Sequence, residues 1–249
     1  MKRVTRDASQ AAFFRWLVLI GLLVFGVVVA YRQDLPAQLL AADESRLSLV
    51  ILAVFVVTSL VAGRRAWRLG EELRTAFALR GAIAAGTSLF DTDANGRPRF
   101  IDDGDSLSHQ HLLLLAHRTL QHGALCPQET LLERLDNAIG RGHETGWFIA
   151  DLMVRLGLLG TVIGFIVMLS SISQLGAVDV QTLKQLLANM SGGMRIALYT
   201  TLTGLGAGIL LGLQYRLLDQ AAERLMAEII ELSEVDVIGE LRRLLDQKV

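Results

Sequence analysis

The chain has one cysteine, three prolines and almost no net charge. A single cysteine, Cys126, excludes an intramolecular disulfide and forms no redox motif. With 24 Lys and Arg against 25 Asp and Glu, the net charge of −1 gives no electrostatic reason to expect nucleic acid as a partner. Apolar residues are abundant instead, at 52% of the chain with a mean hydropathy of +0.43. This composition is typical of an integral membrane protein rather than an ordinary soluble domain.

Charge is also absent from four stretches, each close to the length that crosses the hydrocarbon core of a bilayer. These stretches cover residues 16–31, 47–63, 156–178 and 196–215. Basic residues precede the first stretch, as in a signal peptide, but no small-residue cleavage site follows directly and a second stretch begins soon after. We therefore expect a retained helix and an all-α membrane protein with four transmembrane helices.

The distribution of Lys and Arg predicts the orientation. These residues gather in the first 15 positions, directly after the second stretch and directly after the fourth, whereas the connections 32–46 and 179–195 hold few of them. Because Lys and Arg are enriched on the cytoplasmic side, we expect both termini and the long middle segment to be cytoplasmic.

The expected organisation has four parts. Residues 1–63 form a transmembrane hairpin with spans at about 16–31 and 47–63, and residues 64–149 a cytoplasmic helical segment. Residues 150–215 form a second hairpin with spans at about 152–175 and 195–215, and residues 216–249 a cytoplasmic helical tail. Apolar periodicity predicts that the second and fourth spans extend as amphipathic helices into the cytoplasm, the second to about Gly86.

Turn and cap residues predict the structure of the middle segment. Residues 87–105 are rich in Asp and Gly, and we expect a loop there with a turn at Asn95-Gly96. Helices are expected at about 107–122 and 128–139. Glycines at 140, 142 and 146 then separate the second of these helices from the third span.

Glycine and threonine distinguish the second hairpin from the first. In the second hairpin, glycines recur four residues apart along a helix, and small residues at this spacing let helix backbones approach closely. We therefore expect the fourth span to be buried against the third and against other subunits. The glycines concerned are Gly157, Gly160, Gly164, Gly204 and Gly208. Hydroxyls at membrane depth are costly unless they face protein or water. The hydroxyls concerned are those of Thr161, Thr200, Thr201 and Thr203. Each could simply bond a carbonyl of its own helix, but a cluster favours a functional path.

No expected span contains Asp, Glu, His or Lys in its interior. Proton transport normally needs a titratable group at depth, and hydroxyls do not release protons at neutral pH. If this chain conducts protons, a second protein must therefore supply the titratable group.

Two sequence runs resemble the signature of the MotA/TolQ/ExbB proton channel family. They are Leu-Gly-Leu-Leu-Gly-Thr-Val-Ile-Gly-Phe at 156–165 and Ser-Gly-Gly-Met-Arg-Ile-Ala-Leu-Tyr-Thr-Thr-Leu-Thr-Gly-Leu at 191–205. The resemblance covers about residues 145–230. The four-span layout looks like MotA, whereas the amino-acid sequences of the two motifs are closer to those of TolQ and ExbB.

The resemblance implies a channel subunit of the bacterial inner membrane, not an enzyme, that converts ion motive force into mechanical work. It implies five copies in a ring around two single-span partner helices of the MotB, TolR or ExbD type. The aspartate of the partner would carry H⁺ or Na⁺, with Thr161 and Thr201 lining the ion path. The resemblance implies no cofactor or metal beyond the transported ion. Membrane lipid is expected to surround the complex.

Two features depart from the family or modify the path. Prolines usually flank these motifs in the family, but Pro36, Pro98 and Pro127 all lie outside the spans here. Arg155, where many relatives carry an uncharged residue, could be an electrostatic gate at the cytoplasmic exit or a snorkelling arginine at the interface. Asp151 lies one turn earlier and can pair with it.

Two possible metal sites are disfavoured. Asp91, Asp93, Asn95 and Asp102 fit parts of a calcium-binding EF-hand loop, but Pro98 stands at the eighth position and the pattern favours a polar turn. The middle segment also contains a group of possible zinc ligands, namely His109, His111, His117, His122 and Cys126. Their spacing matches no established zinc site, so packing or surface histidines are favoured.

Three functions remain open on sequence grounds. The first is the ion-conducting subunit just described, the second a non-conducting membrane scaffold of the same fold, and the third an autonomous channel or transporter. The absence of an intramembrane carboxylate disfavours the third for protons. Threonine hydroxyls suit H⁺ and Na⁺ alike. The driven process stays open among outer-membrane transport, envelope maintenance, motility and phage defence.

Overall fold

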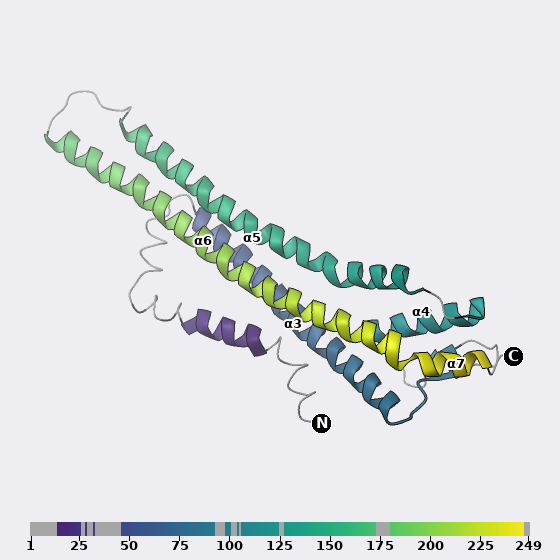
Figure 1. Cartoon of the computed structure of the whole chain (residues 1–249). Coiled ribbons are helices and arrows are strands. Elements are labelled where there is room, and N and C mark those ends of the chain that lie inside the picture. Colours follow the sequence, from purple (N-terminus) through teal and green to yellow (C-terminus); the bar gives the residue numbers. More distant parts are fainter. Residues whose placement is uncertain are drawn as a thin grey trace. The chain divides into compact units, whose positions relative to one another are not determined.

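The computed structural model describes residues 14–25, 28, 32, 46–92, 98–100, 104, 106–124, 127–172 and 180–246. Among the residues described, the structure is helical apart from one short sheet, which confirms the all-α part of the predicted fold class (Figure 1). The elements are a helix at Phe14–Phe25, α3 (Leu47–Ala84), β1 (Phe90–Thr92), β2 (Pro98–Phe100), α4 (Leu107–His122), α5 (Glu129–Ile172), α6 (Val180–Glu231), the π-helix η1 (Leu232–Asp236) and α7 (Ile238–Asp246).

Three of the described helices are long and apolar enough to cross a membrane, namely α3, α5 and α6. They contain the second, third and fourth expected spans. The helix Phe14–Phe25 is apolar but shorter than about 20 residues, the length that a span requires. Part of the first expected span, at residues 26–27 and 29–31, lies outside the described residues.

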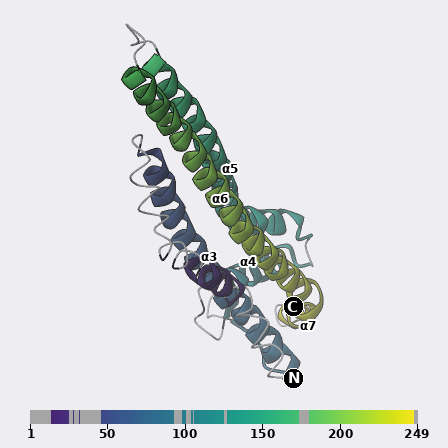
Figure 2. The ribbon, with the colours of Figure 1, turned by 90° about the vertical axis from the view of Figure 1, so that its left-hand side faces the viewer.

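The chain divides into two compact units. We call Trp16–Gly63 together with Glu144–Arg216 the apolar unit, and Arg64–His143 together with the residues from Leu217 onward the polar unit. In the apolar unit, α5 and α6 run side by side in opposite directions (Figure 1, Figure 2). Many large apolar side chains of this unit are exposed, as expected of helices surrounded by lipid or by other subunits.

The polar unit has its own hydrophobic core, in which α4 packs on β2 and α7. Local signals set the element boundaries. The side chain of Ser106 accepts a hydrogen bond from the backbone N–H of His109 and caps the start of α4, and Gly123, at φ 67°, ends that helix. Gly86, at φ 76°, lies just beyond the end of α3. These boundaries confirm the expected helix at 107–122 and the extension of the second span.

The structure corrects two expectations. Residues 87–105 are not only loop, because Phe90 pairs with Phe100 in an antiparallel two-stranded sheet. The rings of these two phenylalanines pack together in the core. The expected turn at Asn95-Gly96 lies outside the described residues. In addition, glycines 140, 142 and 146 do not interrupt the chain before the third span, since α5 is one helix from Glu129.

The glycines of α5 have a packing role that explains this continuity. A side chain at Gly142 would overlap the guanidinium of Arg65, and one at Gly146 would overlap the ring of Tyr215. Glycine within a helix costs about 1 kcal/mol relative to alanine, which neighbouring contacts can offset. The α5 helix therefore continues through these positions.

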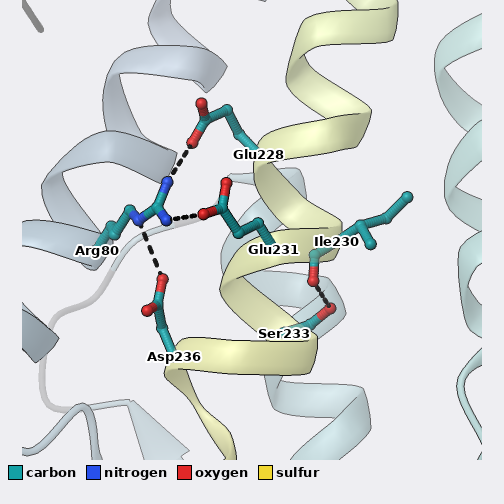
Figure 3. A network of polar contacts seen from close by, with 6 residues as sticks. All are labelled: Arg80, Glu228, Ile230, Glu231, Ser233 and Asp236. Atoms are coloured by element: carbon teal, nitrogen blue, oxygen red, sulfur yellow. Dashed lines mark hydrogen bonds and ion pairs between the residues drawn. The ribbon is translucent and has the colours of Figure 1, made fainter.

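A charged cluster joins α3 to the end of α6 in the polar unit (Figure 3). The Arg80 guanidinium lies 3.2 Å from Glu228 and 3.1 Å from Asp236, and it also pairs with Glu231. The hydrogen bond from Arg80 lowers the pKa of the Glu231 carboxyl, and the same bond raises the pKa of Arg80.

Candidate functional site

A seam of small residues brings α5 and α6 into backbone contact. A Cβ atom added to Gly204 would lie 2.6 Å from the Cα of Gly157 and 2.7 Å from the carbonyl oxygen of Met153. One added to Gly164 would lie 2.6 Å from the carbonyl oxygen of Gly193. These separations are about 1 Å below ordinary carbon contacts, so no larger residue fits without separating the helices.

The same seam holds the other glycines singled out in the sequence. A side chain at Gly160 would overlap Thr200, which is fully buried, and one at Gly208 would lie 2.6 Å from the side chain of Val154. Gly193 is a further member that the sequence analysis did not name. The sequence did contain a signal for this residue, because Gly193 is the second glycine of the Ser-Gly-Gly-Met run at residues 191–194.

All four threonines donate to carbonyls of their own helices. Thr161 Oγ1 donates to the carbonyl of Leu158 at 2.6 Å, and Thr200 Oγ1 to that of Ile196 at 2.9 Å. Thr203 Oγ1 donates to the carbonyl of Tyr199 at 2.8 Å. These hydroxyl protons are therefore satisfied within the chain, which is the simplest of the arrangements considered for them.

Thr201 differs from the others because its hydroxyl also reaches across the seam. Its Oγ1 lies 2.8 Å from the carbonyl oxygen of Ala197 and 3.3 Å from that of Gly157 on α5. Gly157 and Thr161 are four residues apart, so they share a face of α5 about 6 Å apart along its axis. Thr161 and Thr201 therefore lie about one helical turn apart on the same side of the hairpin.

Donation to a carbonyl leaves the lone pairs of each hydroxyl oxygen as acceptors. Thr161 and Thr201 are both partly exposed, whereas Thr200 is buried in the seam. The neighbouring Val162 and Leu202 are apolar and more than half exposed. The two partly exposed threonines can therefore receive a hydrogen bond from water or another donor, or coordinate a small cation.

Arg155 and Asp151 form the ion pair that their spacing indicated. Arg155 Nη2 lies 2.5 Å from Asp151 Oδ2, and both side chains are largely exposed. An exposed pair of this kind contributes little stability. Arg155 therefore already has a counter-charge, directly before the family-like run at 156–165.

A buried polar cluster was missed in the sequence. Gln214 is fully buried in the apolar unit, and its Oε1 accepts hydrogen bonds from Ser59 Oγ at 2.9 Å and Trp16 Nε1 at 3.2 Å. Gly63 has no side chain where the Trp16 ring lies, since an added Cβ would overlap that ring. Gln214 thus links the Phe14–Phe25 helix, α3 and α6. A lone glutamine in an apolar run was the signal for it.

Two of the possible zinc ligands, His109 and His111, are buried. His109 Nδ1 lies 2.7 Å from Ser106 Oγ and its ring packs edge-on against Phe100. Burial lowers the pKa of His111, and its neighbour Gln128 partly opposes this shift. Asp91 pairs in register with Arg99. Asp93, Asn95, Asp102 and Cys126 lie outside the described residues.

The comparisons with known proteins give one match. No curated protein and no solved structure matches the chain. Residues 127–231 match the model of the MotA/TolQ/ExbB proton channel family. This match includes the glycine seam, both threonines and most of α5 and α6, two of the three candidate spans. The segment 127–231 is therefore similar to the MotA/TolQ/ExbB proton channel family, and its long apolar helices are those of a membrane protein.

Proposed function

We propose that this chain is the ion-conducting subunit of an inner-membrane complex that converts ion motive force into mechanical work. The proposed ion is H⁺, with Na⁺ as the alternative. Thr161 and Thr201 line the ion path, and a single-span partner supplies the titratable aspartate. In this proposal the chain crosses the membrane four times with both termini cytoplasmic, and five copies form a ring around a partner dimer of the MotB, TolR or ExbD type.

One observation carries the proposal. Thr161 and Thr201 lie about one turn apart on the same side of the hairpin, and Thr201 reaches the carbonyl of Gly157 across the seam. Their oxygens keep acceptor capacity while their protons are held by the backbone. Such acceptors suit a hydronium ion, a water chain, a desolvated Na⁺ or a protonated carboxyl group of a partner.

The charge distribution supports the need for a partner. The four charge-free stretches contain no carboxylate, histidine or lysine in their interiors, and hydroxyls cannot replace them as proton carriers at neutral pH. Arg155, paired with Asp151, would stand at the cytoplasmic end of the path as a partly neutralised gate. The pairing favours a weak electrostatic effect on the ion over a complete block.

The test is ion flux in cells that express the chain together with its partner. Thr161→Val and Thr201→Val keep the side-chain shape and remove the acceptor, so both should reduce flux and dependent growth. Thr161→Ser and Thr201→Ser keep the hydroxyl and should retain most of it. If both valine variants assemble and conduct normally, the threonines do not line the path. If the wild-type complex assembles but conducts no ion, the chain is a scaffold.

A further inference from the structure

The start of the polar unit carries an unusual group of basic and aromatic side chains. Directly after the charge-free stretch 47–63, α3 continues with Arg64, Trp67 and Arg68. These residues line a groove of about 490 Å³ together with Glu71 and Glu72.

The two carboxylates of the groove are already engaged. Glu71 Oε1 pairs with Arg74 Nη1 at 3.5 Å. Glu72 Oε2 accepts a hydrogen bond from the backbone N–H of Leu107 at 2.9 Å. Neither acidic side chain is therefore directed to the arginines of the groove.

Arg64 and Arg68 form no ion pair or hydrogen bond with any described residue. They are exposed and four residues apart, so two like charges lie next to each other on one helix face. An anion held between them would relieve that repulsion. Trp67 lies on the same stretch of helix with 63% of its surface exposed, a position that an indole ring takes at a membrane–water interface.

The depth of the groove identifies the anion. Arg68 is five residues beyond Gly63, or about 7.5 Å along the helix. The headgroup layer on each side of the hydrocarbon core is about 5–8 Å thick. With the stretch 47–63 in the core, both arginines therefore fall within the headgroup layer. We infer that Arg64, Trp67 and Arg68 form a binding site for the phosphate of an anionic phospholipid, with the lipid chains along the apolar surface of α3.

The lipid phosphate neutralises the charges of Arg64 and Arg68 at the point where α3 leaves the membrane. Lipid binding at this site does not depend on ion conduction. Failure of the wild-type chain to bind phosphatidylglycerol, with normal flux, would overturn only this inference. A loss of flux in the threonine variants with normal lipid binding would overturn only the proposed function.

The test is thermal unfolding of the purified full chain in neutral detergent, titrated with phosphatidylglycerol. Phosphatidylcholine of the same chain length and inorganic phosphate serve as separate arms. We expect phosphatidylglycerol alone to raise the unfolding midpoint. Each arginine near an anionic surface contributes about a fivefold gain in affinity, so Arg64→Gln with Arg68→Gln should weaken the apparent affinity about 25-fold.

A matched control removes the same charge elsewhere. Arg216 and Arg224 are exposed on α6 and follow the charge-free stretch 196–215. Arg216→Gln with Arg224→Gln should weaken the affinity by only about fivefold, because Arg216 alone of the two lies within the headgroup layer. Equal losses in the two double variants would reduce the effect to general attraction and overturn the site. Equal stabilisation by inorganic phosphate would overturn the assignment to lipid. The single variant Trp67→Ala should also weaken binding, and no change there would remove the indole from the site.

Discussion

Replacing Gly204 by alanine should separate α5 from α6. The new Cβ would lie 2.6 Å from the Cα of Gly157 and 2.7 Å from the carbonyl oxygen of Met153. Carbon atoms normally approach to about 3.5–4.0 Å, so the shortfall is about 1 Å. Both neighbours are backbone atoms, and a rotamer change cannot relieve the clash. Overpacking of this kind costs about 1–3 kcal/mol, and we expect the free energy of unfolding to fall by about 1–2 kcal/mol.

The matched control is Gly206→Ala on the same helix. No atom lies within 4 Å of a Cβ added there, and alanine is about 0.5–1 kcal/mol better than glycine within a helix. A second control, Gly140→Ala on α5, also meets open space. Both should leave stability unchanged or raise it.

Unfolding of the purified chain by sodium dodecyl sulfate, followed by tryptophan fluorescence, measures these differences. The seam also holds Thr201 beside the carbonyl of Gly157, so Gly204→Ala should reduce ion flux as well. Equal stability of the Gly204 and Gly206 variants would refute close backbone packing as the basis of the hairpin.

Three further outcomes follow from the polar contacts. A double-mutant cycle of Ser59→Ala and Gln214→Leu should give a coupling of about 0.6 kcal/mol in the unfolding titration, as for other hydrogen bonds between membrane helices, and zero coupling would contradict the buried cluster. Because the pKa of Glu231 is depressed, the stability from its pair with Arg80 is present above about pH 4.5 and is lost as pH falls through the lowered pKa; Arg80→Gln should reduce that acid sensitivity in thermal unfolding. Burial lowers the pKa of His111, so unfolding should become easier as pH falls below 6.5 towards the lowered pKa, and His111→Asn should remove this dependence; an unchanged pH profile would contradict it.

Local signals in the sequence predicted most of the helical structure. Ser106 and Gly123 flank α4, and the charge-free stretch after residue 46 predicts α3. Such signals act within a few residues, and the structure follows them closely. The glycine seam was also predictable, because spacing on a helix determines which residues share a face.

Contacts between distant parts of the chain were not predictable. Arg80 meets Glu228 across 148 positions, and Ser59 meets Gln214 across 155. A lone glutamine in an apolar run draws attention to Gln214, but no local pattern shows which distant residue any of these side chains meets. The sheet at Phe90 and Phe100 was missed for a similar reason, since each strand has only three residues and its stability comes from packing in the core.

The central claim is that Thr161 and Thr201 face a water-accessible ion path while their neighbours do not. The chain has one cysteine, so a Cys126→Ser background allows single cysteines to be placed at will. In the assembled complex, Thr161→Cys and Thr201→Cys should react with a small cationic thiol reagent and lose flux on reaction. Val162→Cys and Leu202→Cys, which replace apolar side chains more than half exposed in the isolated chain, should not react. Labelling at the two apolar positions and not at the threonines would contradict the account.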